Sequence, residues 1–227
     1  MPSQNILKDL FSDKSTRNKL SIFYVFAVAL LIYQGSVFFV IKAEDISSKS
    51  DIPTFTISFI ESDESFDDSR VVIDETREVI TYNPSEEMFS TNNGMGLLMI
   101  NVTYDETSDE LGDTCDTVSV DLVPNSVPAD WNNENNILTG TSDDCSGISL
   151  QLMIFPGYNG QTIQQTGQDS NYWESVWTDQ SYGNGDFELG IEVNVNGPPG
   201  QAFPGVQDEG EEVFVTWKAV FFGVSVE

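Results

Sequence analysis

The feature that most constrains this chain is an uninterrupted apolar run near its N-terminus. The run begins at Leu20 and ends at Ile41, and none of its residues is Asp, Glu, Lys or Arg. At ~1.5 Å per residue, a helix of this length spans about 33 Å and can cross the ~30 Å hydrocarbon core of a bilayer. A soluble helix rarely stays apolar on all faces for this long. The sequence therefore predicts one transmembrane α-helix, with the lipid bilayer as its partner.

The charges on either side of the apolar run predict its orientation. The residues before it carry four bases and two acids, whereas the segment after it turns acidic at Glu44, Asp45 and Asp51. Lys and Arg beside a membrane segment stay in the cytoplasm, so we expect the N-terminus inside and the rest of the chain outside. The predicted parts are a cytoplasmic tail (1–19), a signal-anchor helix (20–42), a juxtamembrane linker (43–52) and an extracytoplasmic domain (53–227).

A cleaved secretory signal is the alternative interpretation of the same run. The hydrophobic part of such a signal is usually about 7–15 residues long and ends at a cleavage site of small residues. The run here is longer, and Ile41-Lys42-Ala43 is a poor cleavage site. We therefore favour a permanent anchor, which places the protein in the cell membrane with a single span.

Charge is the second strong signal. The chain has 37 acids, 9 bases and a formal net charge of −28. Beyond residue 42 lie 35 of those acids and only 4 of the bases, a net of −31. A surface of this sign repels nucleic acid and anionic lipid, so we expect neither as a partner. A protein with such a surface also stays soluble in concentrated salt, because ions there reduce the range of the repulsion between its charges to a few ångströms.

The chain beyond the linker alternates polar and apolar residues, as strands with one buried face do. The clearest cases are residues 187–195 and 213–226, both rich in strand-forming residues. The other expected strands are residues 54–60, 71–73, 78–82, 96–104, 117–123, 147–155 and 172–178. Gly-, Asn- and Pro-rich turns separate them, and no long amphipathic helix pattern appears. We therefore expect an all-β antiparallel sandwich, either jelly-roll or immunoglobulin-like.

Two resemblances accompany this fold prediction. The stretch 182–193 (YGNGDFELGIEV) resembles a glycine-rich hairpin that occurs late in many secreted jelly-roll domains, which favours a jelly-roll. Gly190 departs from that hairpin pattern, and we interpret it as a candidate bulge. In overall style, a short basic tail, one anchor and an acidic β domain, the chain resembles single-pass surface proteins of marine or halophilic archaea. That resemblance implies a place in the cell envelope but no particular site residues.

The two cysteines, Cys115 and Cys145, predict a disulfide. Both lie in the part expected outside the cytoplasm, where conditions are oxidising. Closing a loop of this length stabilises a fold by ~3–4 kcal/mol in the chain-entropy view. The bond would also gather four flanking acids whose oxygens suit calcium, although no calcium-loop spacing is present. These candidate calcium ligands are Asp113, Asp116, Asp143 and Asp144.

Two further candidate sites are visible. Tyr172, Trp173, Trp177 and Tyr182 lie close together among amide and carboxylate side chains, a combination found on carbohydrate-binding faces. On the expected strand, however, Trp173 and Trp177 would share one face, which is the usual pattern of core residues. Asn101 begins a glycosylation sequon, Asn-Val-Thr, within an expected strand, where a glycan fits only if that face is exposed.

The residues available for catalysis are few. The chain has no histidine, which removes triads built on histidine, imidazole acid–base chemistry and the usual zinc sites. No phosphate-binding glycine loop is present, and with so many acids a carboxylate pair carries little information. We expect a non-catalytic envelope domain that binds or assembles with other membrane or surface proteins, without a cofactor. The alternative is a carbohydrate- or calcium-dependent binding module.

Overall fold

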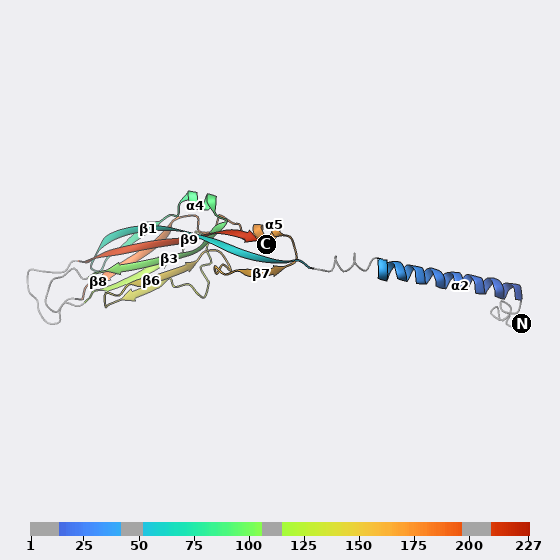
Figure 1. The fold of residues 1–227 in the computed structure, drawn as a ribbon. Coiled ribbons are helices and arrows are strands. Elements are labelled where there is room, and N and C mark those ends of the chain that lie inside the picture. Colours follow the sequence, from blue (N-terminus) through green and yellow to red (C-terminus); the bar gives the residue numbers. More distant parts are fainter. Residues whose placement is uncertain (1–13, 42–51, 106–114, 197–209) are drawn as a thin grey trace, which may run out of the picture. The chain divides into compact units, whose positions relative to one another are not determined.

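The computed structural model describes residues 14–41, 52–105, 115–196 and 210–227, which form two units, Met1–Pro53 and Thr54–Glu227 (Figure 1). In the first unit the structure describes helix α2 (Lys14–Ser36), which continues into a π-helical turn, η1 (Val37–Ile41). Within the described ranges, one helix is long and apolar enough to cross a membrane, and it covers Lys14–Phe39. None of the described side chains of α2 is buried, and large apolar ones such as Phe23, Phe26 and Leu31 are exposed.

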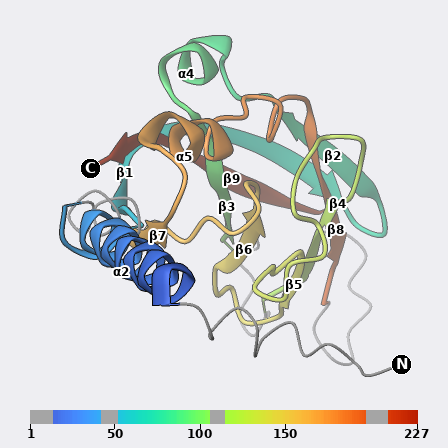
Figure 2. The ribbon, with the colours of Figure 1, turned by 90° about the vertical axis from the view of Figure 1, so that its right-hand side faces the viewer.

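The second unit is a sandwich of two antiparallel sheets, which confirms the predicted fold class (Figure 2). The five-stranded sheet has, in order, β6 (Ile148–Met153), β3 (Gly94–Tyr104), β9 (Gly210–Val226), β1 (Thr54–Ile73) and β7 (Ile163–Thr166). The four-stranded sheet has the order β2 (Arg77–Tyr82), β8 (Phe187–Asn194), β4 (Thr117–Val123) and β5 (Thr139–Ser142). Two short helices lie between strands, α4 (Glu86–Thr91) and α5 (Ser170–Val176).

The main core fills the space between the two sheets. Alternate residues of β8 and β9 point into it because successive side chains of a strand face opposite ways. These inward residues are fully buried, and Trp217 is the largest of them. The core residues of the two strands are Phe187, Leu189, Ile191 and Val193 on β8 and Val213, Val215, Trp217, Ala219 and Phe221 on β9. Each of the Val, Leu, Ile and Phe side chains among them contributes roughly 1.5–3 kcal/mol through removal from water.

A second, smaller core covers one end of the outer face of the five-stranded sheet. There Phe222 of β9 and Phe59 of β1 contact aromatic residues from the segment between β6 and β8. Tyr158 stacks on Phe222 with ring centroids 4.7 Å apart, and Trp177 meets Phe59 edge-on at 4.9 Å. We call Phe59, Phe155, Tyr158, Trp177, Tyr182, Phe222 and Val224 the outer aromatic cluster.

The strand expected over residues 172–178 is wrong, because these residues belong largely to α5. The helix begins after Asp169, whose carboxylate accepts a hydrogen bond from the Tyr172 N–H at 2.8 Å. Such a side-chain cap satisfies an N–H group that has no partner inside the helix. Trp173 and Trp177 therefore share a face through helical spacing, and the strand geometry expected for them does not occur.

The first strand is longer than expected. The segments 54–60 and 71–73 were predicted as separate strands, but both belong to β1, which has 20 residues. The stretch between them is acidic and lacks an apolar alternation, which hid its strand character. The short strands β5 and β7 and the helix α4 were also not predicted, since each has only 4–6 residues.

Gly190 does not mark a bulge. Its ladders to Val79 of β2 and Asp121 of β4 run through without a shift in register. Instead, the guanidinium of Arg77 lies over Gly190, where a Cβ atom would collide with it. From that position Arg77 forms an ion pair with Asp121 at 2.7 Å. The irregular position lies in β3, between Met95 and Leu97.

Candidate functional site

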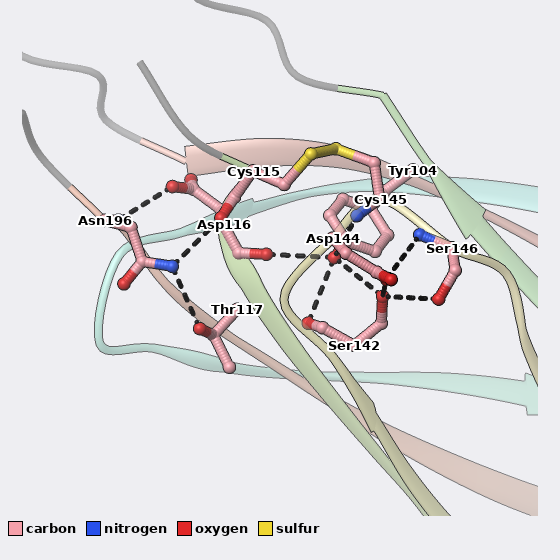
Figure 3. Close-up of a disulfide and its surroundings, with 9 residues drawn as sticks. All are labelled: Tyr104, Cys115, Asp116, Thr117, Ser142, Asp144, Cys145, Ser146 and Asn196. Atoms are coloured by element: carbon pink, nitrogen blue, oxygen red, sulfur yellow. Dashed lines mark hydrogen bonds between the residues drawn. A yellow bond between two sulfur atoms is a disulfide. The ribbon is translucent and has the colours of Figure 1, made fainter. Parts of the chain in front are cut away.

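The predicted disulfide between Cys115 and Cys145 is confirmed (Figure 3). It joins the start of β4 to the turn between β5 and β6, with 5.5 Å between the two Cα atoms. Tyr104 of β3 lies beside this bond with its ring buried. Its hydroxyl is 2.9 Å from the Asp116 carbonyl oxygen and 3.0 Å from that of Ser142, and it accepts a bond from the Cys145 N–H at 3.3 Å.

Two of the acids beside the disulfide are held by separate sets of neighbours. Asp116 is buried, and its carboxylate accepts a hydrogen bond from the Asn196 N–H at 2.8 Å. Asp144 accepts bonds from the Ser146 N–H and the Ser142 hydroxyl, both at 3.1 Å. The bonds from Ser146, followed by the bond from Ser142, lower the pKa of Asp144.

The calcium prediction receives no added support from these contacts. Asp143 is exposed, and Asp113 lies outside the described residues. Across the parts of the chain that the structure describes, no group of three or more Asp, Glu, His or Cys side chains is placed to hold a metal ion.

The four aromatic residues predicted for carbohydrate binding divide into two pairs. Trp177 and Tyr182 belong to the outer aromatic cluster and pack on Phe155, with centroid distances of 5.6 and 5.2 Å. Trp173 donates its indole N–H to the Gly167 carbonyl at 2.9 Å, and Tyr172 packs edge-on against it at the protein surface. The packing expected of core residues is therefore seen for Trp177 and Tyr182, and carbohydrate binding stays a prediction.

A surface pocket of about 360 Å³ adjoins the outer aromatic cluster. It is lined by Phe155, Pro156, Ser175, Val176, Trp177, Thr178, Asp179 and Tyr182. Flat apolar rings beside hydroxyl and carboxylate groups can hold a small polar molecule that has an apolar face. Sequence reasoning found Trp177 and Tyr182 but missed Phe155 and Pro156, whose only signal was the Pro-Gly turn that follows β6.

Asn101 lies on the exposed outer face of β3, the condition that a glycan in a strand requires. Its side-chain oxygen accepts a hydrogen bond from the hydroxyl of Ser149 on the neighbouring strand β6 at 2.8 Å. The amide nitrogen is the atom that a glycan modifies, and this bond does not use it. Glycosylation itself stays a prediction.

The comparisons with known proteins are sparse. No family model matches the chain, and no curated protein matches it. Among solved structures, a Nora virus structure matches with 11% sequence identity and a TM-score of 0.31. The match covers 73% of this chain and 59% of that chain, so this chain spans less than two thirds of its length. At this level of likeness nothing about function follows from it.

The fold and the disulfide together indicate a broad class of protein. The chain carries an apolar N-terminal helix, of the kind that serves as an anchor or a signal, and a disulfide-bonded β-sandwich. Both features are typical of proteins that are secreted or associated with a membrane.

Proposed function

We propose that this protein is a membrane-anchored domain of the cell envelope that is not catalytic, works outside the cytoplasm and assembles with other membrane or surface proteins. The observation that carries the proposal is the joining of one apolar helix to an acidic, disulfide-bonded sandwich. The helix supplies attachment, and the basic residues before it favour a cytoplasmic N-terminus. The absence of histidine from the sequence supports binding over catalysis.

Membrane placement is tested first, with the protein in its native membranes. The full chain should resist extraction by alkaline carbonate, keep its N-terminal residues and expose its sandwich to protease from the outer side. Replacing Leu30 and Leu31 together by Arg should abolish membrane retention, because each charge at a helix centre costs about 2.5–3.5 kcal/mol on insertion scales. Replacing both by Phe is the matched control. A mature protein that begins after residue 42 would contradict the anchor.

Assembly is tested by affinity purification of the tagged full chain from membranes in mild detergent, followed by mass spectrometry. The proposal expects other membrane or surface proteins to co-purify in constant ratio. The control is the Arg-substituted chain, which should lose those partners when it loses the membrane. Recovery of the chain alone, under conditions that keep other membrane complexes intact, would contradict the proposal.

The resemblance to surface proteins of saline-habitat archaea adds a condition to the same proposal. A net charge of −31 beyond residue 42 destabilises a compact fold by self-repulsion, which salt screens. We expect the sandwich to melt at a higher temperature in molar salt than in dilute buffer. An unchanged melting temperature would argue against a saline habitat and would leave membrane assembly unaffected.

A second candidate function is carbohydrate binding at the pocket beside α5. It is favoured by one observation, the pairing of the Trp177 and Tyr182 rings with Thr178 and Asp179 around a hollow of about 360 Å³. Glycan-array screening of the full chain in detergent tests it. A genuine ligand should lose binding with Trp177→Ala and keep it with Tyr172→Ala, since Tyr172 does not line the pocket.

Calcium dependence is the remaining form of that second candidate. It is supported by the two carboxylates of Asp143 and Asp144, which lie beside the disulfide and are suitable calcium ligands. Titration calorimetry of the full chain with calcium tests it. Binding heat that disappears in Asp144→Asn would support a site there. No heat at millimolar calcium would exclude one in that affinity range.

A further inference from the structure

One edge of β1 has no partner strand along most of its length. β9 pairs with one side of β1 from Ile57 to Ile73. On the other side, β7 pairs only with residues 54–57. Among the residues that the structure describes, no strand pairs with this edge beyond Ile57. An open edge offers a row of unpaired N–H and C=O groups on which another strand can form a ladder.

The backbone groups that face outward along this edge can be identified. Thr56 exchanges both of its backbone hydrogen bonds with Glu227, next to the end of β9. The β1–β9 register runs on without a shift, so even-numbered residues bond to β9 and odd-numbered residues point to the open edge. Ser69 fits this pattern, because its N–H is bound by the Asp68 carboxylate at 2.8 Å. The N–H of Ser65 therefore faces outward.

The open edge is strongly acidic. Asp63, Glu64, Asp67 and Asp68 lie within six consecutive residues of β1, and the side chain of Asp63 is 55% exposed. Two ion pairs at the surface offset little of this charge, because surface ion pairs contribute little. Lys218 lies 3.5 Å from Asp63, and Arg70 lies 3.9 Å from Asp68. A second copy of this chain would bring acids opposite acids, which is unfavourable across paired strands. A basic strand would bring opposite charges together.

A shallow pocket beside the same edge fits a long basic side chain. It has a volume of about 420 Å³ and is formed by Asp67, Asp68 and Ser69 of β1 with Phe214, Val215 and Thr216 of β9. The Phe214 ring is 44% exposed, and the Asp67 carboxylate is held by the Thr216 hydroxyl at 2.7 Å. The stem of an Arg or Lys can pack on the ring while its charge meets the carboxylate.

We propose that the open edge of β1, over residues 62–68, receives an extended basic segment of a partner protein as an added strand, with one Arg or Lys in the Phe214 pocket. The backbone ladder supplies the affinity, and the acids select a cationic strand over a neutral one or a second copy. This inference rests on the proposed function, because it names the class of partner with which the anchored domain assembles.

The direct test uses the full chain in detergent micelles and a nine-residue labelled peptide of alternating Arg and Thr, with fluorescence anisotropy as the readout. Two matched peptides serve as controls, one with Gln in place of Arg and one N-methylated at alternate residues so that it cannot form a ladder. We expect each control to bind at least tenfold more weakly. Equal binding of the Gln peptide would overturn the charge selection, and equal binding of the methylated peptide would overturn the added strand.

Variants of β1 locate the site. Ser65→Pro removes one outward N–H group and leaves the hydrogen bonds to β9 in place. It should weaken binding of the Arg peptide at least tenfold, whereas Ser65→Thr should leave that binding unchanged. Asp67→Asn should weaken it several-fold. Circular dichroism checks that each variant folds. If Ser65→Pro does not fold, the comparison with the methylated peptide still tests the added strand. A chain that dimerises, and whose dimer Ser65→Pro abolishes, would show the edge to be occupied by a second copy and overturn the proposal.

The affinity purification distinguishes a failure of strand addition at β1 from a failure of the proposed assembly with membrane or surface proteins. Partners that Ser65→Pro releases and Ser65→Thr retains would support both. Partners that stay bound to Ser65→Pro would refute the edge while leaving membrane assembly in place. Recovery of no partner at all would instead refute the proposed assembly.

Discussion

The two halves of β9 have different surroundings, although they form one strand. From Glu211 to Trp217 buried and exposed side chains alternate, because only the inner face of the sheet is covered there. From Ala219 to Phe222 four consecutive side chains are buried, because the outer aromatic cluster also covers the outer face. The difference shows that local cover, more than strand propensity, decides which positions tolerate polar residues.

The largest effect should come from the main core, at Trp217. Trp217→Ala should lower the free energy of unfolding by about 4 kcal/mol, the usual loss for a large buried ring. Within the described residues the indole N–H has no hydrogen-bond partner, so packing accounts for the loss. Urea unfolding followed by circular dichroism in micelles measures it. Trp217→Phe is the control and should cost clearly less; equal losses would show that packing is not the cause.

The outer aromatic cluster should contribute somewhat less, as Phe222 can test. Phe222→Ala should lower the unfolding free energy by about 3 kcal/mol, because the ring is fully buried but its neighbours lie near the surface and can move into the space. The same urea titration measures it, with Phe222→Leu as a milder control. A loss under about 1 kcal/mol would mean that the cluster packs only loosely on the sheet.

The hydrogen bond from Tyr158 to Glu61 should have a smaller effect. The hydroxyl donates to the carboxylate at 2.5 Å in a half-buried setting, so Tyr158→Phe should cost about 1 kcal/mol at neutral pH. Thermal unfolding measures the loss. Tyr172→Phe, at an exposed ring, is the matched control and should change little.

The same pair gives an expectation for alkaline pH. Burial, and next the hydrogen bond to Glu61, raise the pKa of Tyr158. Because the folded pKa lies above the unfolded value of about 10, this stabilisation is complete below pH 10 and is lost as pH rises through the folded pKa. Tyr158→Phe should therefore lose less stability than the unaltered chain between pH 9 and 12. A parallel loss in both would assign the alkaline sensitivity to other tyrosines.

The smallest effect should come from the uncovered half of β9. Phe214→Thr should change the unfolding free energy by less than about 0.5 kcal/mol, because the ring is partly exposed on the open outer face and Thr suits a strand. Urea unfolding beside Phe222→Ala gives the comparison directly. A loss as large as that of Phe222→Ala would mean that this half is covered in the native protein.

The contrast along β9 also explains what the sequence could predict. β8 and most of β9 were found because one covered face produces a visible alternation. The disulfide followed from compartment and cysteine number alone. The central part of β1 was missed because its residues lie at an edge with little apolar cover, so acids replace the alternation.

The pocket beside α5 was only half predictable. Trp177 and Tyr182 stood out as aromatic residues close together in sequence. Phe155 reaches them from the other end of a long connection, through contacts that no local pattern encodes. The sequence marks the start of the helix by one capping residue, Asp169, and the aromatic residues that follow it also favour strands.

The position of β9 has a consequence for how the domain is made. It lies between β1 and β3 in the five-stranded sheet, yet it is the last of the described strands along the chain. β1 is the first of the described strands along the chain, and it finds its main partner only when residues 210–226 have been synthesised. Pairing over such a separation folds slowly, and until then the edges of β1 and β3 that β9 later covers stay exposed. The five-stranded sheet is therefore completed only when β9 is available, and a nascent chain stalled before β9 should be a substrate for chaperones.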